Sequence, residues 1–311
     1  MESLKGRSLL ALIDCTPEEI RFLLDLSHQV KKEQRQGLRQ QRFLGRSLAM
    51  LFEKRSTRTR AAFETAFGEE GGHPVFLSSA DIQLGAKETV EDTARVLGGM
   101  FDIIEFRGFR HETVEKLAAH AGVPVINGLT DRWHPTQALA DLMTIEEHAG
   151  TPAGIRSVYI GDGRNNVSSS LLVAGAALGL DHHVICPQEL SPSPDLLEVV
   201  ARRSDYPGTV TVHHDPRAIP RDASVVYTDV WVSMGEEENS AERIDMLRPY
   251  QVTEELMGTA PKAIFMHCLP AVRGNEMTAG VIDGPTSRVW DQAENRKHTI
   301  KAVMLAGLGL A

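Results

Sequence analysis

Residues 47–60 read SLAMLFEKRSTRTR, and this run joins a strand-like apolar segment to a basic, hydroxyl-rich turn. Its first six residues are typical of a buried strand, and residues 59–67 have helical spacing. The hydroxyl groups therefore fall near a helix N-terminus, where unpaired backbone N–H groups attract anions. The run predicts a phosphate site, and its alternative is a solvated basic surface beside a helix cap. Its cations are Lys54, Arg55, Arg58 and Arg60.

Short apolar runs rich in Val and Ile alternate with amphipathic stretches along the whole chain. This pattern predicts an α/β fold with parallel sheets covered by helices. A chain of 311 residues exceeds the ceiling of about 250 for one core, so two domains are expected. A long helical pattern over 136–149 ends at Gly150, which places the boundary near residue 150. The expected strands are 47–52, 102–106, 124–127, 157–160, 183–186, 224–228 and 263–267.

Composition excludes several classes of protein. The chain has 42 acidic and 33 basic residues and a formal net charge of -9, which disfavours binding to nucleic acid. Three well-separated cysteines make a disulfide framework improbable and fit a reducing compartment. No apolar stretch approaches the roughly 18 residues that cross a bilayer, and residues 1–30 contain no apolar leader core. We therefore expect a cytoplasmic protein that binds no membrane.

Polar motifs directly follow five of the expected strands. In open α/β sheets, ligands bind at the carboxyl edge of the strands, so these motifs are expected to share that edge. Each also has a structural explanation: Arg107 can pair with a carboxylate, His134 can cap a helix, and Cys268 can be a small buried hydrophobe. The motifs are Arg107-Gly108, residues 132–137, residues 161–166, residues 228–235 and residues 266–270.

Other ligand motifs fit less well. The chain contains no P-loop signature, and Asn166 replaces the third glycine of a dinucleotide fingerprint, so an NAD enzyme is a weak alternative. Adjacent strand residues point to opposite faces, so His267 and Cys268 are not expected to form a direct catalytic pair. The histidine pairs 182–183 and 213–214 lack accompanying ligands at metal spacing, and no metal site is predicted.

Three motifs, taken in order, resemble the aspartate/ornithine carbamoyltransferase family: residues 56–60 (STRTR), 134–137 (HPTQ) and 267–270 (HCLP). Within that family, residues 229–235 (DVWVSMG) and Cys268 resemble the ornithine enzymes, because the aspartate enzymes lack both features. The resemblance runs from about Leu9 to Met304. It implies two Rossmann-like domains, each with a central parallel sheet flanked by helices, and an active site in the cleft between them.

The resemblance also implies a role for each domain. Residues 1–150 are expected to bind carbamoyl phosphate, with a C-terminal helix over about 295–311 packing back on them, and residues 151–294 to bind ornithine. No cofactor and no metal are implied. The family residues around the phosphate and the reacting carbonyl match Ser56, Thr57, Arg58, Thr59, Gln83, Arg107, His134, Gln137, Cys268, Leu269 and Arg296.

Individual roles follow by position. Arg107 is expected to bridge phosphate and carbonyl oxygen, since its planar fork engages two oxygens and keeps its proton. His134 is expected to donate to the carbonyl oxygen and Gln137 to accept from the amide. With Cys268 and Arg296, Arg107 and His134 form the expected catalytic set. The residues expected to hold the amino and carboxylate groups of ornithine are Asn166, Asp229, Ser233 and Met234.

The implied activity is transfer of the carbamoyl group of carbamoyl phosphate to the δ-amino group of L-ornithine, giving L-citrulline and phosphate. Gln83 resembles a residue that reaches a neighbouring subunit, which implies a homotrimer or a multiple of one with shared active sites. Related acceptors (putrescine, N-acetylornithine or lysine) and a catalytically silent homologue are the alternatives. The same residues serve arginine biosynthesis and citrulline breakdown, so the sequence is compatible with either.

Overall fold

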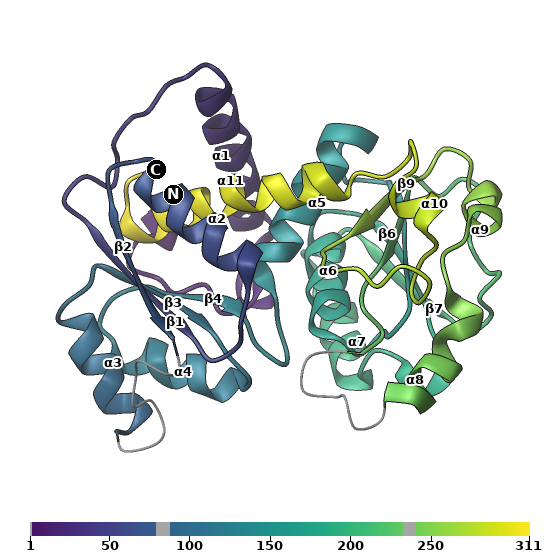
Figure 1. Cartoon of the computed structure of the whole chain (residues 1–311), viewed down its shortest axis with the longest axis horizontal. Coiled ribbons are helices and arrows are strands. Elements are labelled where there is room, and N and C mark those ends of the chain that lie inside the picture. Colours follow the sequence, from purple (N-terminus) through teal and green to yellow (C-terminus); the bar gives the residue numbers. More distant parts are fainter. Residues whose placement is uncertain (1, 79–87, 233–239) are drawn as a thin grey trace. The chain divides into compact units, whose positions relative to one another are not determined.

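The computed structural model describes residues 2–78, 88–232 and 240–311. The chain forms two compact units, one of Met1–Ala140 with Glu294–Ala311 and the other of Asp141–Ala293 (Figure 1). The unit boundaries fall inside two helices, α5 (Pro135–Ala149) and α11 (Val289–Leu308). The last part of the chain therefore belongs to the same unit as its beginning.

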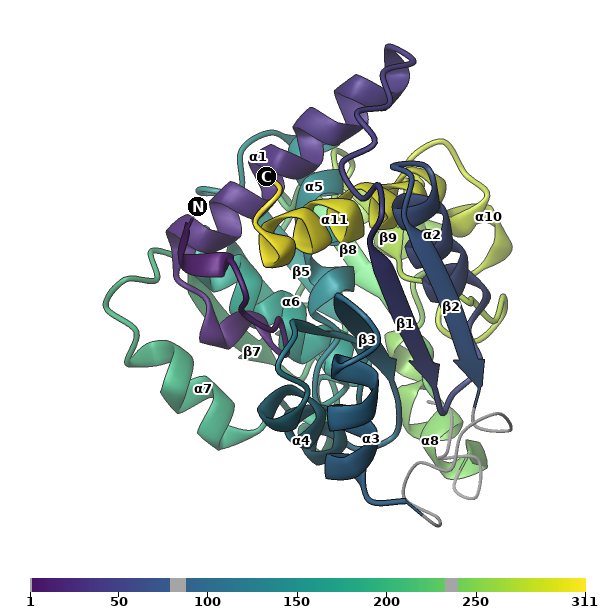
Figure 2. The same cartoon turned by 90° about the vertical axis from the view of Figure 1, so that its left-hand side faces the viewer.

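The first unit contains a four-stranded parallel sheet with the order β2-β1-β3-β4. Figure 2 shows β1 beside β2 in this sheet. The strands are β1 (Ser47–Phe52), β2 (His73–Ser78), β3 (Ile103–Arg107) and β4 (Val125–Leu129). The helices are η1 (Glu2–Leu4), η2 (Leu12–Asp14), α1 (Pro17–Arg35), α2 (Thr57–Gly68), α3 (Val90–Gly98) and α4 (His111–His120), with the first turns of α5 and most of α11.

The second unit contains a five-stranded parallel sheet with the order β7-β6-β5-β8-β9. The strands are β5 (Arg156–Ile160), β6 (Asp181–Ile185), β7 (Thr209–His213), β8 (Val225–Thr228) and β9 (Ile264–His267). The helices are α6 (Asn166–Ala177), η3 (Gln188–Leu190), α7 (Pro194–Ala201), α8 (Ser240–Leu247), η5 (Arg248–Tyr250), α9 (Glu254–Thr259) and α10 (Ala279–Ile282).

These two helix-covered parallel sheets confirm the predicted fold class. Each sheet also has a point where the strand order reverses, between β1 and β3 in the first and between β5 and β8 in the second. Crevices for ligands form at the carboxyl ends of the strands at such points. The helix after β1 and the end of β3 therefore mark one candidate site, and the helix after β5 and the end of β8 mark another.

All seven predicted strands are present, and most of their ends differ by only one or two residues. Two further strands, β2 and β7, were not predicted. Both lie at an edge of their sheet, and both are only partly buried along their length. An edge strand exposes one side to solvent, so it lacks the continuous apolar run that marks a central parallel strand.

Local sequence signals fix the residue at which α1 begins. Thr16 accepts a hydrogen bond from the Glu19 N–H, and the Glu19 carboxylate accepts one from the Thr16 N–H. Pro17 occupies the first helical position, where its missing N–H has no cost. This capping box starts α1 at a defined residue, so the buried face of the helix keeps its register.

Buried charges hold α11 within the first unit. Lys31 on α1 donates to the Asn295 side chain at 2.6 Å, and Lys301 lies 3.2 Å from Glu70. Figures 1 and 2 both show α11 beside α1. Removing one partner of a buried charged pair costs several kcal/mol, so these contacts specify where α11 lies. They set the position of Arg296, which follows Asn295.

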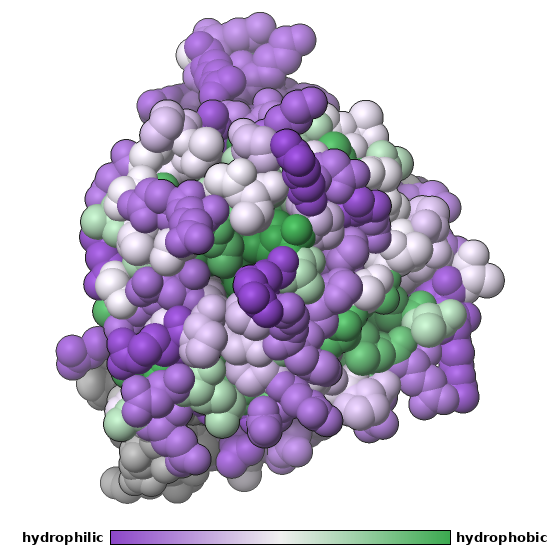
Figure 3. All heavy atoms as spheres, turned by 90° about the vertical axis from the view of Figure 1, so that its right-hand side faces the viewer, coloured by the Kyte–Doolittle hydropathy of each residue, from purple (hydrophilic) through white to green (hydrophobic). Residues whose placement is uncertain are grey.

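On the face drawn in Figure 3, hydrophobic patches lie among hydrophilic residues. None of the helices in the described ranges combines the length and the hydropathy needed to span a bilayer.

Asp181, the first residue of β6, links this strand to its two neighbours in the second sheet. It accepts hydrogen bonds from Arg156 on β5 at 2.7 Å and from Thr209 on β7 at 2.8 Å. Burial alone raises the pKa of Asp181, but the hydrogen bonds from Arg156, Thr209 and His183 outweigh it and lower the pKa from 3.8 to about 2. The ionised form therefore stabilises the folded state above pH 3.8, and this contribution disappears as the pH falls to 2.

We predict that Asp181→Asn lowers the free energy of unfolding by roughly 1 kcal/mol at pH 7, because the pair is partly exposed and screened. The difference from wild type should shrink between pH 4 and pH 2, as measured by urea unfolding. Asp195→Asn, at an exposed position of α7, is the control and should show no such loss. A deficit in Asp181→Asn that persists at pH 2 would contradict this account.

Candidate functional site

The first half of the candidate site is the turn between β1 and α2. Ser56 is the N-cap of α2, and its side chain accepts a hydrogen bond from the Thr59 N–H at 3.1 Å. Thr57 and Arg58 occupy the first turn of the helix. The N-terminal N–H groups and the helix dipole give this turn an intrinsic affinity for anions.

The Thr59 hydroxyl lies between two guanidinium groups. Arg107, at the end of β3, approaches its Oγ1 at 3.3 Å, and Arg296, on α11, approaches it at 3.1 Å. All three side chains are buried, with exposed fractions of 0% for Thr59, 6% for Arg107 and 3% for Arg296. Two buried cations around one oxygen repel each other, so the arrangement suits a ligand that brings negative charge.

His134 lies beside these cations, directly before α5. Burial lowers its pKa well below 6.5, and the charges of Arg296, Arg107 and Arg58 lower it further. The imidazole is therefore neutral at physiological pH and carries one N–H donor. Gln137, in the first turn of α5, is also buried. The first half-site thus combines fixed cations, a neutral donor and a side-chain amide.

The structure does not bring all the cations of the basic run over residues 54–60 to the first half-site. Arg60 pairs with Glu64 at 2.9 Å and stacks on the ring of Phe76. Lys54 lies over the ring of Phe109, 4.5 Å from its centre. Arg58, from the same basic run, lies close enough for its charge to lower the pKa of His134. Gln83 lies outside the described residues.

This half-site can bind an oxyanion and polarise a carbonyl group. A guanidinium engages two oxygens of a phosphate in one plane, and helix N–H groups bind a third. A neutral imidazole can donate to a carbonyl oxygen without adding another charge to the cluster. Donors that are already in position stabilise negative charge that develops during a reaction.

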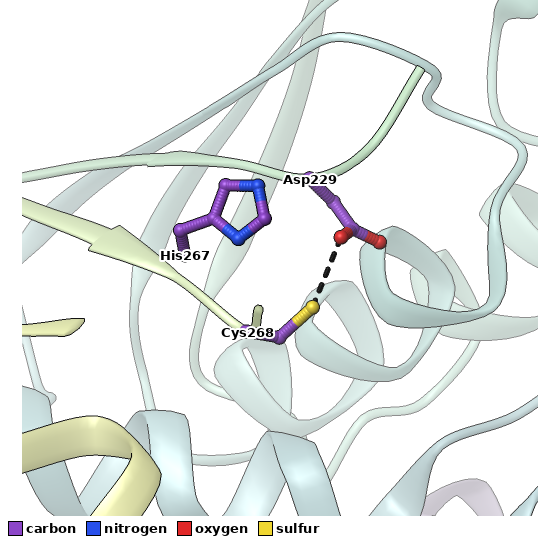
Figure 4. A group of neighbouring side chains, drawn as sticks. All are labelled: Asp229, His267 and Cys268. Carbon is purple, nitrogen blue, oxygen red and sulfur yellow. Dashed lines mark hydrogen bonds between the residues drawn. The ribbon is translucent and has the colours of Figure 1, made fainter. Parts of the chain in front are cut away.

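The second half of the candidate site is centred on Asp229, which follows β8. Its carboxylate accepts a hydrogen bond from the Cys268 thiol at 3.0 Å (Figure 4). It accepts another from the Asn165 amide at 3.3 Å. Burial raises the pKa of Asp229 above 3.8, while His267, the Cys268 thiol and the Val230 N–H oppose that rise. A buried carboxylate surrounded by donors is suited to holding a cationic group.

His267, at the end of β9, lies beside this carboxylate. Its Nδ1 accepts a hydrogen bond from the Leu269 N–H at 2.8 Å, so Nε2 carries the proton and donates to Glu276 at 3.1 Å. Leu269 has a positive φ of 59°, which turns the chain sharply after Cys268. Such backbone conformations in residues other than glycine cluster at functional sites.

One argument from the sequence fails here. Alternation along a strand predicted that His267 and Cys268 would point apart, but β9 ends at His267 and alternation stops there. Ligand-type atoms of Asp229, His267 and Cys268 lie within 4.8 Å of one another. The thiol nevertheless donates to Asp229, and both imidazole nitrogens are engaged by Leu269 and Glu276. The cluster is therefore a hydrogen-bonded one centred on the carboxylate.

Asn165 also belongs to this half-site; the sequence pointed to Asn166 and left open which of the two makes the main contact. Asn165 donates to Asp229, and it also donates to the buried Tyr159 hydroxyl at 2.7 Å. Asn165 is the N-cap of α6, and Asn166 is the first helical residue. An Asn before a helix start, three residues ahead of Ser168, was the available signal. Ser233 and Met234 lie outside the described residues.

Comparison with known proteins covers almost the whole chain. Residues 7–147 match the family model for the carbamoyl-P binding domain of aspartate/ornithine carbamoyltransferase, and residues 153–306 match the model for its Asp/Orn binding domain. The chain is 60% identical to the ornithine carbamoyltransferase of Thermotoga maritima, over 98% of this chain and 99% of the relative. It is 59% identical to that of Caldanaerobacter subterraneus subsp. tengcongensis, with the same coverage.

A solved structure is also similar. The ornithine carbamoyltransferase of Pyrococcus furiosus superposes with a TM-score of 0.93 at 47% sequence identity, covering 98% of each chain.

The Thr59 hydroxyl yields a prediction for the first half-site. Thr59→Val keeps the shape of the side chain but removes the oxygen between the two guanidiniums. Because hydrogen bonds to charged groups contribute about 1.5–3 kcal/mol, we expect inorganic phosphate to bind roughly ten- to a hundredfold more weakly by calorimetry. Thr65→Val, at an exposed position of the same helix, is the control. Equal phosphate affinity in both variants would show that the hydroxyl does not organise an anion site.

Proposed function

This chain belongs to the aspartate/ornithine carbamoyltransferase family, and from that premise we propose that it transfers a carbamoyl group to the δ-amino group of L-ornithine. The donor is carbamoyl phosphate, and the products are L-citrulline and phosphate. The observation that carries this proposal is the Thr59 hydroxyl between the guanidiniums of Arg107 and Arg296, beside the neutral His134. Phosphate and carbonyl oxygen are the two groups that such a set recognises together.

Carbamoyl phosphate binds first-unit residues in this proposal. Ser56, Thr57, Arg58 and Thr59 hold the phosphate through helix N–H groups, hydroxyls and a guanidinium. Arg107 spans the phosphate and the carbonyl oxygen, and Arg296 adds a second guanidinium. His134 donates its N–H to the carbonyl oxygen, and Gln137 accepts from the carbamoyl nitrogen. Gln83 completes the phosphate contacts from a neighbouring subunit.

Activation of the carbamoyl carbonyl group depends on the neutral state of His134. When the amine attacks, negative charge develops on the carbonyl oxygen, and Arg107, Thr59 and the His134 N–H stabilise it. A protonated imidazole would add a further buried charge to three arginines, which burial and repulsion both oppose. Loss of one such donor typically costs a hundredfold or more in turnover.

L-Ornithine binds second-unit residues. Asp229 holds the cationic α-amino group, and Asn166 holds the α-carboxylate, with Ser233 and the Met234 backbone beside them. Asn165, Cys268 and the His267–Glu276 pair keep Asp229 in place. The contacts of Asn165 and Cys268 with the carboxylate support this assignment. Cys268 orients the δ-amine, and the Cys268 and Leu269 carbonyls accept from the carbamoyl nitrogen.

The amine must lose a proton before it attacks, because an alkylamine in water has a pKa of about 10.4. That first proton goes to solvent. We propose that the neutral amine then attacks, and that the departing phosphate takes the second proton, from the attacking nitrogen, as the carbon–oxygen bond to phosphate breaks. The amine nitrogen forms the new bond to the carbamoyl carbon, so the charges balance without a protein base. Bringing both reactants together supplies the remaining acceleration through proximity.

The assembly, the cellular location and the pathway of the enzyme are also proposed from its family membership. We propose a cytoplasmic homotrimer, or a multiple of one, in which Gln83 shares active sites between subunits, and a role in arginine biosynthesis. Sedimentation equilibrium tests the assembly, because the mass must be a multiple of three times the 34.2 kDa chain. A carbamoyltransferase for putrescine, N-acetylornithine or lysine is the second candidate. The free α-amino group that Asp229 can hold favours ornithine.

A substrate panel tests the proposed reaction. We expect citrulline from carbamoyl phosphate and L-ornithine, and no comparable product from putrescine, N-acetylornithine, lysine or L-aspartate, by colorimetric ureido assay. Arg58→Ala should lower kcat/KM by at least a hundredfold, because a guanidinium–phosphate contact is removed. Arg60→Ala is the matched control, since Arg60 pairs with Glu64 and should matter little. Preference for another amine would require Asp229 to be reassigned.

Cys268→Ser tests whether the thiol forms a covalent intermediate. A serine hydroxyl can still donate to Asp229, so we expect KM for ornithine to rise about tenfold while kcat falls less than a hundredfold. Cys186→Ser is the control, because burial raises the pKa of that thiol to about 11 and it follows β6, which is two strands from β8 in the sheet. Complete loss of turnover, with carbamoylated wild-type enzyme detected by mass spectrometry, would contradict the proposal.

A further inference from the structure

Glu105 is a fully buried acid beneath the first half-site. It lies on the central strand β3, two residues before Arg107, and its exposed fraction is 0%. Side chains two residues apart on a strand point to the same face, so Glu105 and Arg107 share one side of the sheet. Among the residues that the structure describes, neither carboxyl oxygen of Glu105 has a hydrogen-bond partner.

The neighbouring strand leaves space for this carboxyl group. At Gly128 on β4, an added Cβ atom would overlap Glu105 Oε1. The register between β3 and β4 also shifts here, since Phe106 pairs with Asn127 and Arg107 with Leu129. A glycine at the irregular step therefore accommodates the acid, and any larger side chain would push the carboxyl group elsewhere.

The charges that face Glu105 are those of the phosphate cluster. Arg107 on its own strand and Arg296 on α11 lower the pKa of Glu105, but burial has the larger effect and raises it well above 4.5. Its partners in register, Met50 on β1 and Ile126 on β4, are apolar. An ionised carboxylate without a hydrogen-bond partner would be very costly here, so the acid is neutral in this arrangement.

We propose that Glu105 is a positioning residue for the phosphate half-site. As a neutral acid it does not compete for the guanidiniums of Arg107 and Arg296, whereas as a carboxylate it draws them away from the phosphate. Glu105 thus makes phosphate binding depend on pH, and phosphate binding at alkaline pH takes up one proton. This inference rests on the proposed function, because it assigns phosphate as the ligand of those guanidiniums.

The test is the affinity for inorganic phosphate between pH 8 and pH 10, where free phosphate is a dianion, measured by calorimetry. We expect wild-type affinity to fall about tenfold per pH unit above the pKa of Glu105. Glu105→Gln keeps the shape of the side chain and cannot ionise, so its affinity should change less than twofold. In two buffers of different ionisation enthalpy, wild type should show proton uptake on binding and Glu105→Gln should not.

Glu19→Gln is the matched control, because a glutamine at this position keeps the capping box of α1. Glu19 is a buried acid of the same unit, and although burial raises its pKa, the Thr16 N–H and Arg7 lower it overall. Its replacement should leave the alkaline loss of phosphate affinity as in wild type. If Glu105→Gln does not fold, Glu105→Leu gives the same readout, because leucine is of similar size and carries no ionisable group.

Two outcomes overturn the inference: a wild-type affinity that stays constant to pH 10, or a Glu105 variant that loses affinity in parallel with wild type. Failure of the proposed function is a separate result. Wild-type protein that binds phosphate with the expected pH dependence but forms no citrulline would refute the transferase assignment and leave the role of Glu105 intact.

Discussion

The first half-site depends on one contact, the Thr59 hydroxyl between the guanidiniums of Arg107 and Arg296. This contact requires three separate segments to converge: the start of α2, the end of β3 and the middle of α11. The strand order places the first two together, because the reversal between β1 and β3 brings their carboxyl ends to one crevice. Lys31 and Lys301 fix the third, since their buried contacts hold α11 against the unit. Folding thus brings cations together before any anion is bound.

Burial disfavours charge in both half-sites, but the outcomes differ. It removes the charge of His134, because three arginines and a dry environment disfavour an imidazolium. It also disfavours the charge of Asp229, but here Cys268, Asn165 and the Val230 N–H offer compensating donors. The chain therefore has a neutral donor in one half-site and a supported carboxylate in the other. Neither state follows from residue type alone, since both depend on the neighbours that folding supplies.

The sequence predicted the central strands, the fold class and a helix N-terminus near the hydroxyls of residues 56–59, because these depend on local apolar runs and capping residues. It missed β2 and β7, whose partly exposed edges carry mixed residues. It also could not choose between Asn165 and Asn166, because the choice depends on which residue caps α6, and helix ends are uncertain from pattern alone. Glu105 was invisible for another reason. Within IIEFR it interrupts an apolar strand, and only the three-dimensional neighbours show that it is buried without a partner.

The return of residues 294–311 to the first unit has a consequence for protein synthesis. A ribosome adds the chain from the N-terminus, so the strands of the first sheet and the whole second unit emerge before Arg296 does. A nascent chain can pair β1 with β3 early, but it lacks the second guanidinium and the buried anchors of α11 until the last helix is made. Chains that stall before this point carry an incomplete anion site and an uncovered apolar surface. Premature products are thus both inactive and recognisable to the cell's chaperones and proteases.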